Sequence, residues 1–561
     1  MRNWIELTLF IGLLLLIVRM LGRYMASVFF NPSKKPIFLL GSLENLIYRL
    51  CGVASDEEMS WKQYAKAMLY FNGSGTLFLF FLQLLQNYLP FNPQHFPGVE
   101  PILAFNTAIS FVTNTNWQAY AGETTLSYFT QMSALTVQNF LSAATGNAVL
   151  LALIRGICRK STQTIGNFWV DSTRTVVYLL LPLCVIFSLV LVSQGVIQNL
   201  NPYVEASTLM GEKQIIPMGP AASQIAIKQL GTNGGGFFNA NSAHPFENPT
   251  PLSNFLEMFA IVCIPAAATY MYGILIQSKK QGWMIFSIML ILWALGLSVA
   301  LISENLANPI LSAHPILEGK ETRFATPDSI IWAVSTTATS NGSVNAMHSS
   351  LSPLAGGVAL FNMMIGEIVF GGIGVGLCGM LMFIFLTVFI AGLMVGRTPE
   401  YLGKKIEKTE MQWVMLSILS PCVLILLGSG IASTLPQALK SLGNSGPHGL
   451  SEILYAFSSA AGNNGSAFAG LNANTPFYNI SLALIMLLTR LSILIPSLAV
   501  AGSLAQKNTI APSLGTFPTD QPLFLILLFS IIIIVAALTF FPALSLGPIV
   551  EHFLMLRAQA F

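Results

Sequence analysis

The chain has 561 residues, of which 54% are hydrophobic and only 9% are charged. Because a soluble domain carries roughly 25% charged residues, this composition excludes a soluble enzyme, a disordered protein and a nucleic-acid-binding protein. The net charge of +3 is too small to indicate an anionic partner, so the lipid bilayer is the partner that the composition predicts.

Apolar runs of the length needed to cross a bilayer, about 20 residues, recur along the whole chain. The runs cover residues 4–18, 67–87, 127–154, 175–195, 254–277, 283–303, 356–395, 411–431, 477–503 and 521–545. No small-residue cleavage site follows the first run, so we interpret it as a retained span rather than a signal peptide. The runs predict an all-α polytopic membrane protein with ten transmembrane helices.

Basic residues alternate between the two sides of the predicted spans. The segments after odd-numbered spans hold 17 of the 26 Lys and Arg residues: Arg23, Lys34, Lys35, Arg49, Lys62, Lys66, Arg155, Arg159, Lys160, Arg174, Lys279, Lys280, Arg397, Lys404, Lys405, Lys408 and Lys507. The other side holds 6, so the positive-inside rule places the first side in the cytoplasm and both chain ends outside. A chance effect of unequal loop lengths is the alternative, although all five inward segments agree.

Four of the outward segments contain a short stretch of small, hydroxyl and amide residues without any charge. In chain order, and called here the first to fourth loops, they read Thr113-Asn114-Thr115-Asn116-Trp117, Thr232-Asn233-Gly234-Gly235-Gly236, Thr339-Ser340-Asn341-Gly342-Ser343 and Gly462-Asn463-Asn464-Gly465-Ser466. Aligned on their first residues, the loops lie 119, 107 and 123 residues apart. Each follows a short apolar helical segment and precedes a full span.

The repeated unit is therefore a span, a half-helix, a loop and a second span. Four such units lie between one extra span at either end. We divide the chain into a first span with its cytoplasmic loop (1–66), repeats 1 to 4 (67–154, 175–277, 283–395 and 411–503) and a last span with an external C-terminus (521–561).

Four re-entrant loops around one axis would form a pore. Non-helical backbone at membrane depth is tolerated only where it is buried in protein or lines water. Rings of backbone carbonyl oxygens can replace the hydration shell of an alkali cation, and the negative C-terminal ends of the half-helices favour a cation. We predict that the first four residues of each loop form a selectivity filter, although one such loop alone would more often be an ordinary external turn.

The sequences around three of these loops carry a family resemblance. Residues 230–249, 335–348 and 458–471 resemble the KdpA family, the potassium-channel-like subunits of bacterial Kdp potassium-transporting ATPases, and the similarity extends over the whole chain. The resemblance implies K⁺ as the transported ion and a fold of the potassium-transporter superfamily. None of the four loops contains a full Thr-Val-Gly-Tyr-Gly filter sequence.

The resemblance also implies partners and a location. It implies a complex with a P-type ATPase subunit (KdpB-like), a single-span accessory subunit (KdpC-like) and a small KdpF-like peptide in the bacterial cytoplasmic membrane. K⁺ would then enter this chain from outside and pass laterally to the ATPase subunit, which would supply the energy.

A carboxylate and a cluster of glycines lie within the long apolar run 356–395. Glu367 is followed by Gly371, Gly372, Gly374 and Gly376. A run of about 40 residues is too long for one straight helix across the hydrocarbon, so we predict an interrupted helix below the third loop that gates the pore. Close packing of small residues between helices is the alternative for the glycines.

Arg490 is the second ionisable residue that lies well inside an apolar run. We assign it to the ion path, where a fixed positive charge could stop cations from escaping to the cytoplasm. A buried ion pair between the third and fourth repeats, or an arginine that snorkels to the inner surface, remains open.

The sequence offers no means of using ATP. It contains no GxxxxGK(S/T) motif and no Asp-Lys-Thr-Gly phosphorylation motif, and its six cysteines show no metal-ligand spacing. We therefore expect no nucleotide to bind this chain and no metal except K⁺ at the filter. The leading hypothesis is the potassium-selective subunit of an ATP-driven uptake pump; a stand-alone K⁺ channel or symporter of the same superfamily and a membrane-embedded enzyme are the alternatives.

Replacement of Arg490 by alanine tests its assignment to the ion path. We expect Arg490→Ala to lose the coupling of ion movement while the protein still inserts and assembles, because the substitution removes only the fixed charge. Transport assays on membranes with equal amounts of protein measure this effect, and unchanged transport would contradict the assignment.

Overall fold

The computed structural model describes residues 2–30, 38–309, 316–394, 396, 398–510 and 517–559. Lys34, Lys35 and Arg397, three of the basic residues used to orient the chain, lie outside these ranges.

Ten helices in the described ranges are long and apolar enough to cross a membrane. They are α1 (Arg2–Phe30), α3 (Trp61–Leu84), η2 with α6 (Thr130–Thr136, Val137–Cys158), α7 with η3 and α8 (Phe168–Arg174, Thr175–Leu180, Leu181–Ser193), α10 (Pro251–Leu275), α11 (Lys279–Glu304), α14 (Val375–Met394), α15 (Lys408–Ala432), α18 (Pro476–Gln506) and α19 with η6 and α20 (Pro522–Leu544, Ser545–Ile549, Val550–Leu556). The prediction of an all-α protein with ten spans is confirmed.

The first span is much longer than its apolar run suggested. α1 continues to Phe30, whereas the run was assigned to residues 4–18. Val18, Met25 and Phe29 are buried, so the second half of α1 packs inside the protein although Arg19 and Arg23 interrupt its hydropathy.

Shorter elements connect or enter the bundle of spans. Helices that end within it are α4 (Pro101–Val112), α9 (Ala221–Leu230), α12 (Thr326–Ala338), α13 (Pro353–Met364) and α17 (Gly446–Gly462). The remaining helices are α2 (Phe38–Cys51), η1 (Gln86–Tyr88), α5 (Gly122–Thr125), η4 (Asn241–Ala243), η5 (His348–Ser350) and α16 (Pro436–Leu439). Two antiparallel hairpins complete the elements, β1 (Val204–Ser207) with β2 (Lys213–Ile216) and β3 (Glu400–Tyr401) with β4 (Lys404–Lys405).

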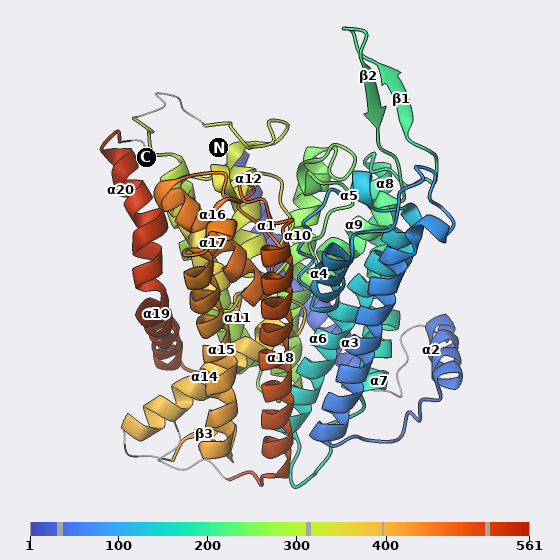
Figure 1. Ribbon diagram of the computed structural model, residues 1–561. Helices are drawn as coiled ribbons and strands as arrows, with labels where there is room; N and C mark the ends of the chain where they lie inside the picture. The colour runs from blue at the N-terminus through green and yellow to red at the C-terminus, as the bar shows by residue number, and fades with distance from the viewer. Residues whose placement is uncertain are drawn as a thin grey trace.

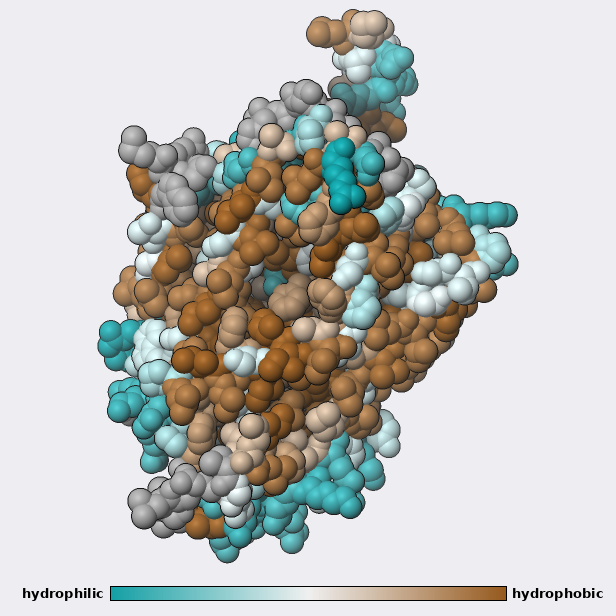
Figure 2. Space-filling view, turned by 90° about the vertical axis from the view of Figure 1, so that its left-hand side faces the viewer, coloured by the Kyte–Doolittle hydropathy of each residue, from teal (hydrophilic) through white to brown (hydrophobic). Residues whose placement is uncertain are grey.

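The spans run side by side through the height of the molecule (Figure 1). The β1–β2 hairpin projects at one end, where the N- and C-terminal ends of the drawn chain also lie, and β3 lies at the other end. One lateral face is hydrophobic over its middle height, with polar residues gathered mainly toward its upper and lower ends (Figure 2). This distribution is that of a protein whose sides contact lipid.

Helices α6, α10 and α14 form the centre of the bundle. They are buried over most of their length, whereas α1, α3 and α15 expose most of theirs. The apolar run 356–395 is divided between α13, which ends at Met364, and α14, which begins at Val375. The ten residues between these two helices are non-helical and buried for the most part, so they lie inside the protein.

A lysine joins three chain segments at the end of the molecule opposite the long hairpin. Lys404 Nζ donates to the carbonyl oxygens of Gly156 at 2.8 Å, of Leu504 at 2.7 Å, and of Arg159. Gly156 and Leu504 lie in the last turns of α6 and α18, so the ammonium stabilises the negative ends of two helices. Burial lowers the pKa of Lys404 to about 8.

A buried ion pair connects α6 to α7 on the same side. Arg155 binds Asp171 through two hydrogen bonds, of 2.6 and 2.7 Å. The Tyr64 hydroxyl of α3 donates to Asp171 Oδ2 at 2.9 Å, so three spans meet at one carboxylate.

Removal of this carboxylate should destabilise the protein strongly. Asp171→Ala leaves the Arg155 guanidinium buried without its partner, which costs about 3–5 kcal/mol. Thermal unfolding in detergent measures the effect as a lower melting temperature. Glu205→Ala is the matched control: it breaks the exposed Lys213–Glu205 pair, for which a change of only about 0–1 kcal/mol is expected. Equal melting temperatures of the two variants would contradict the prediction.

Candidate functional site

Each of the four loops is placed by a half-helix that ends inside the protein. These helices are α4, α9, α12 and α17, and their last turns are mostly buried. The carbonyl groups of a last helical turn have no partner within the helix and give that end a partial negative charge. Four negative helix ends therefore converge on the loops.

The loops share one backbone pattern, in which two left-handed residues flank a residue with negative φ. The left-handed residues are Asn114 (φ 63°) and Asn116 (54°), Thr232 (50°) and Gly234 (80°), Ser340 (55°) and Gly342 (85°), and Asn463 (56°) and Gly465 (100°). The left-handed residues therefore turn the chain at the same two places in each loop. Thr and Ser adopt positive φ rarely, so the surrounding contacts hold them there.

Backbone hydrogen bonds fix which residues of the four loops correspond. The middle residue of each pattern donates to the carbonyl five residues earlier; the pairs are Thr115–Ser110, Asn233–Lys228, Asn341–Thr336 and Asn464–Ser459. In this register Gly231, and not Thr232, corresponds to Thr113. The second loop is therefore displaced by one residue from the alignment on first residues, and we extend it to residues 231–236.

Neighbouring loops are joined in a closed ring. The side-chain donors and their acceptors are Asn114 Nδ2 to Thr232 O at 2.9 Å, Asn341 Nδ2 to Lys228 O at 3.1 Å, Ser340 Oγ to Asn463 O at 2.9 Å, and Asn463 Nδ2 to Thr115 Oγ1 at 3.0 Å. The first loop thus contacts the second, the third contacts the last turn of α9 directly before the second loop, the third also contacts the fourth, and the fourth contacts the first. The order in sequence is the order around the ring, called here the four-loop ring.

Glycines allow the loops to approach one another closely. A Cβ atom on Gly234 would lie 1.7 Å from Asn341 O, one on Gly342 would lie 2.1 Å from Asn464 O, and one on Gly465 would lie 2.0 Å from Thr115 O. Asn116 takes the corresponding position in the first loop. The same glycine–carbonyl contact therefore recurs at three of the four junctions, where both space and positive φ exclude a side chain.

An open cavity of about 770 Å³ lies over one end of the ring. Its lining includes one left-handed residue from each loop, namely Asn116, Gly234, Gly342 and Gly465. His348 also lines it, and burial lowers the pKa of His348 to about 4, so this imidazole is neutral at pH 7. Lys320 in the lining forms a 2.5 Å ion pair with Glu304. We call this cavity the vestibule. Neither His348 nor Lys320 places an unpaired positive charge in it.

The non-helical segment between α13 and α14 supports the ring from the opposite end. Ile373 N donates to Thr232 Oγ1 at 3.0 Å, and a Cβ on Gly372 would lie 3.4 Å from Ser340 Cβ. The other three predicted glycines are packed too tightly for a side chain. A Cβ added to Gly371 would lie 1.7 Å from Glu367 O, one added to Gly374 would lie 2.2 Å from Gly146 O, and one added to Gly376 would lie 2.3 Å from the Cα of Gly371.

Glu367 lies in the same segment, and its carboxylate is buried beside the fourth loop. A Cβ on Gly462 would lie 3.2 and 3.3 Å from the two carboxylate oxygens. The polar side chains of Ser340 and Asn464 lie against this carboxylate, but neither oxygen accepts a hydrogen bond of standard geometry from a described residue. A buried carboxylate without such bonds is costly, which makes it a candidate to contact a cation.

Arg490 faces the first repeat instead of Glu367. Its Nη2 donates to Ser142 O of α6 at 3.4 Å, and Arg490 is buried. Within the part of the chain that the structure describes, Glu367 and Arg490 form no ion pair with each other, so the proposed pairing between the third and fourth repeats is not formed. The burial also excludes a side chain that snorkels to the inner surface.

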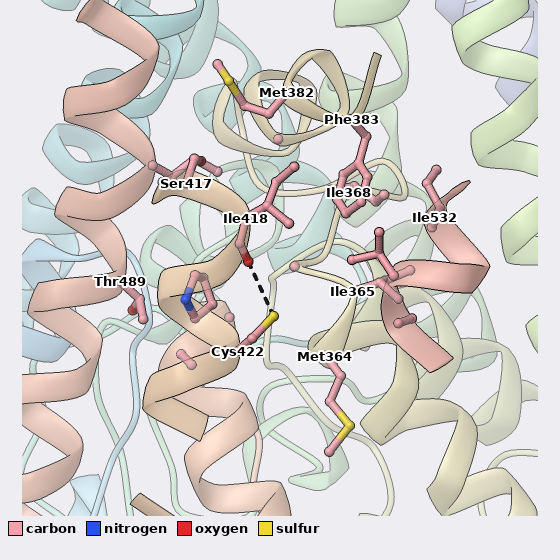
Figure 3. A pocket seen from close by; sticks show the side chains of 18 of the residues that line it. Met364, Ile365, Ile368, Met382, Phe383, Ser417, Ile418, Cys422, Thr489 and Ile532 are labelled. Carbon is pink, nitrogen blue, oxygen red and sulfur yellow. Dashed lines mark hydrogen bonds between the residues drawn. The ribbon is translucent and has the colours of Figure 1, made fainter. Parts of the chain in front are cut away.

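Gly462 and Asn463 of the fourth loop, together with residues of several spans, line a cavity of about 70 Å³; Figure 3 shows part of this lining. Apolar side chains of α14, α15 and α19 line it, among them Met382, Ile418 and Ile532. The Cys422 thiol in this lining donates to Ile418 O at 3.3 Å, so its hydrogen bond is made within α15.

The sequence matches the family described as KdpA, the potassium-transporting ATPase A subunit, over residues 8–553. The chain belongs to this family. The potassium-transporting ATPase potassium-binding subunit of Mesorhizobium japonicum is 53% identical over the full length of both chains. The subunit of the same name from Herpetosiphon aurantiacus is 56% identical over 98% of this chain and 99% of its own. The resemblance to the KdpA family is thereby confirmed.

A solved structure shares the fold. The potassium transporter TrkH from Vibrio parahaemolyticus superposes with a TM-score of 0.53 at 13% identity, over 88% of this chain and 97% of the TrkH chain. At this identity the likeness concerns the fold alone.

Sequence reasoning missed two members of α6 that hold the ring. Asn139 Oδ1 accepts from Asn116 Nδ2 at 2.8 Å, and Ser142 Oγ donates to Asn114 Oδ1 at 2.7 Å. In this KdpA-family chain they belong to a polar stripe, Gln138, Asn139, Ser142 and Thr145, within the apolar run 127–154. Polar residues at helical spacing inside a span were the available signal.

Substitution of a ring glycine tests the geometry. Gly342→Ala should abolish cation binding at the ring, because its Cβ would overlap Asn464 O and the residue has φ 85°. The rise in melting temperature on addition of K⁺ measures binding. Gly430→Ala in α15 is the control, since a Cβ there meets no atom within 4 Å. An undiminished K⁺ effect in Gly342→Ala would contradict the predicted role of the ring.

Proposed function

We propose that this chain is the potassium-selective, channel-like subunit of an ATP-driven, high-affinity K⁺ uptake pump. The observation that carries the proposal is the closed four-loop ring, built from neutral groups at the base of a wide vestibule. Membership in the potassium-transporting ATPase A subunit family, and relatives named as the potassium-binding subunit, support the same conclusion.

The chemistry of the ring suits a monovalent cation. Its loops offer backbone carbonyl, hydroxyl and amide oxygens and contain no carboxylate. Neutral oxygens can replace the water around K⁺, whereas divalent cations are usually held by carboxylates as well. A carbonyl oxygen has two lone pairs, so Thr232 O and Asn463 O can each accept a side-chain hydrogen bond and still face an ion.

The geometry suggests a route through the chain. K⁺ would enter the vestibule, lose its water at the four-loop ring, and pass Glu367 below it. We assign lateral transfer to a neighbouring subunit to the small cavity that Gly462 and Asn463 line together with residues of α14, α15 and α19. Arg490 on the α6 side of the bundle would repel cations from a straight path to the cytoplasm.

In this proposal the chain works in the bacterial cytoplasmic membrane with the vestibule and both chain ends outside. Its partners would be a KdpB-like P-type ATPase subunit, a KdpC-like single-span subunit and a small KdpF-like peptide. The ATPase subunit would bind the nucleotide, and this chain would bind only K⁺.

A stand-alone K⁺ channel or symporter is the second candidate. The closed ring favours it, because four loops of one chain complete the ring without a partner. The two functions differ in whether ions move without the ATPase subunit.

Uptake at micromolar K⁺, with and without the ATPase subunit, separates the two candidates. We expect cells that lack other high-affinity K⁺ uptake to grow only when both proteins are present, because this chain alone has no energy source. Radioactive Rb⁺ or K⁺ uptake measures the flux directly. Appreciable uptake by this chain without the ATPase subunit would defeat the pump proposal and favour the channel.

A further inference from the structure

A group of buried charges lies directly behind the second loop. Lys228 Nζ in α9 is 2.6 Å from Glu247 Oε2, and both side chains are fully buried. Lys228 Nζ also donates to Ser242 Oγ at 2.8 Å. Glu257 of α10 accepts from Ser242 Oγ at 3.2 Å, which places a second carboxylate in the same group.

The backbone carbonyl of Lys228 links these charges to the second loop and also to the third loop. Lys228 O accepts from Asn233 N and Gly234 N of the second loop, at 2.9 and 3.1 Å, and from Asn341 Nδ2 of the third, at 3.1 Å. Glu247 thus anchors the side chain of the same residue whose carbonyl contacts the second and third loops.

The next residue makes a second connection of the same kind. Gln229 Nε2 donates to Glu257 Oε2 at 2.8 Å, and Gln229 Oε1 accepts from Ser343 Oγ of the third loop at 3.1 Å. Two consecutive residues of α9 therefore join a buried carboxylate on one side to the third loop on the other.

This arrangement is peculiar to one quadrant of the ring. The residues that correspond to Lys228 are Ser110, Thr336 and Ser459, and those that correspond to Gln229 are Phe111, Thr337 and Ala460, none of which is charged. Burial of a lysine and two carboxylates is costly. Since the other three quadrants form the same backbone pattern without such charges, the pattern itself does not require them.

We propose that Lys228, Glu247 and Glu257 form a charged brace that sets the spacing between the second and third loops, and so determines the affinity and selectivity of the ring for K⁺. The brace acts by positioning the last turn of α9. Gly234 N donates to Lys228 O in this turn, and Gly234 also packs against Asn341 O of the third loop. These three residues are positioning residues and do not contact the ion. The inference rests on the proposed function, because it assumes that the ring binds K⁺.

The test compares K⁺ with Rb⁺ in the complex purified with its ATPase subunit. We expect Lys228→Met to raise the KM for K⁺ by about tenfold, the scale of one lost charged hydrogen bond. The ratio of the KM values for K⁺ and Rb⁺ should move toward one, while kcat at saturating K⁺ stays within about twofold. Glu257→Gln, which keeps the shape and an acceptor, should shift the same ratio less.

Asp171→Ala is the control, because it disrupts a buried ion pair remote from the loops. It should lower the melting temperature without any change in the ratio of KM values. If Lys228→Met does not fold, Glu257→Gln carries the test. An unchanged ratio in both variants, or a loss of melting temperature alone, would overturn the brace.

A second measurement separates this inference from the proposed function. Stabilisation of the isolated chain by K⁺ and by Rb⁺ reports on the ring without any partner. If ATP hydrolysis does not respond to K⁺ but the cations still stabilise the wild-type chain, the pump proposal fails and the variants still test the brace by thermal shift. If neither cation stabilises the wild-type chain, both proposals fall.

Discussion

The architecture depends on the need to satisfy polar backbone inside a membrane. Four non-helical loops place N–H and C=O groups at membrane depth, where no regular helix binds them. Asparagine and serine side chains solve this problem by donating to carbonyl or hydroxyl oxygens of the neighbouring repeat, and glycines let the chains come close enough to do so. The half-helices, the broken span and the polar stripe of α6 all serve to hold this ring of contacts.

Hydropathy and internal repetition were sufficient to predict the spans and the positions of the four loops. Side-chain contacts between repeats were not predictable in the same way. The one-residue displacement of the second loop follows from Gly231 ending α9, which short similar sequences could not reveal. Lys228 and Glu247 lie 19 residues apart, so nothing local linked them. Arg490 was recognised as unusual, but its neighbour Ser142 is 348 residues away in sequence.

Pseudo-symmetry and its departures carry different information. The repeated pattern of left-handed residues, with its glycine–carbonyl contact at three junctions, gives the ring its common geometry. The departures distinguish the quadrants: Asn116 replaces glycine in the first loop, charges lie behind the second, and Glu367 lies beside the fourth. Because all four loops belong to one chain, each quadrant is free to differ in sequence, which identical subunits around an axis do not allow.

The hydrogen bond between Asn463 and Thr115 joins residues that are 348 positions apart, and it closes the ring. During synthesis at about 5–20 residues per second, the first loop waits roughly 20–70 seconds for its last neighbour. Throughout that interval the Thr115 hydroxyl lacks its Asn463 donor. The fourth repeat therefore completes the ring last, and a chain that ends before it lacks the partner of Thr115 and cannot close the ring.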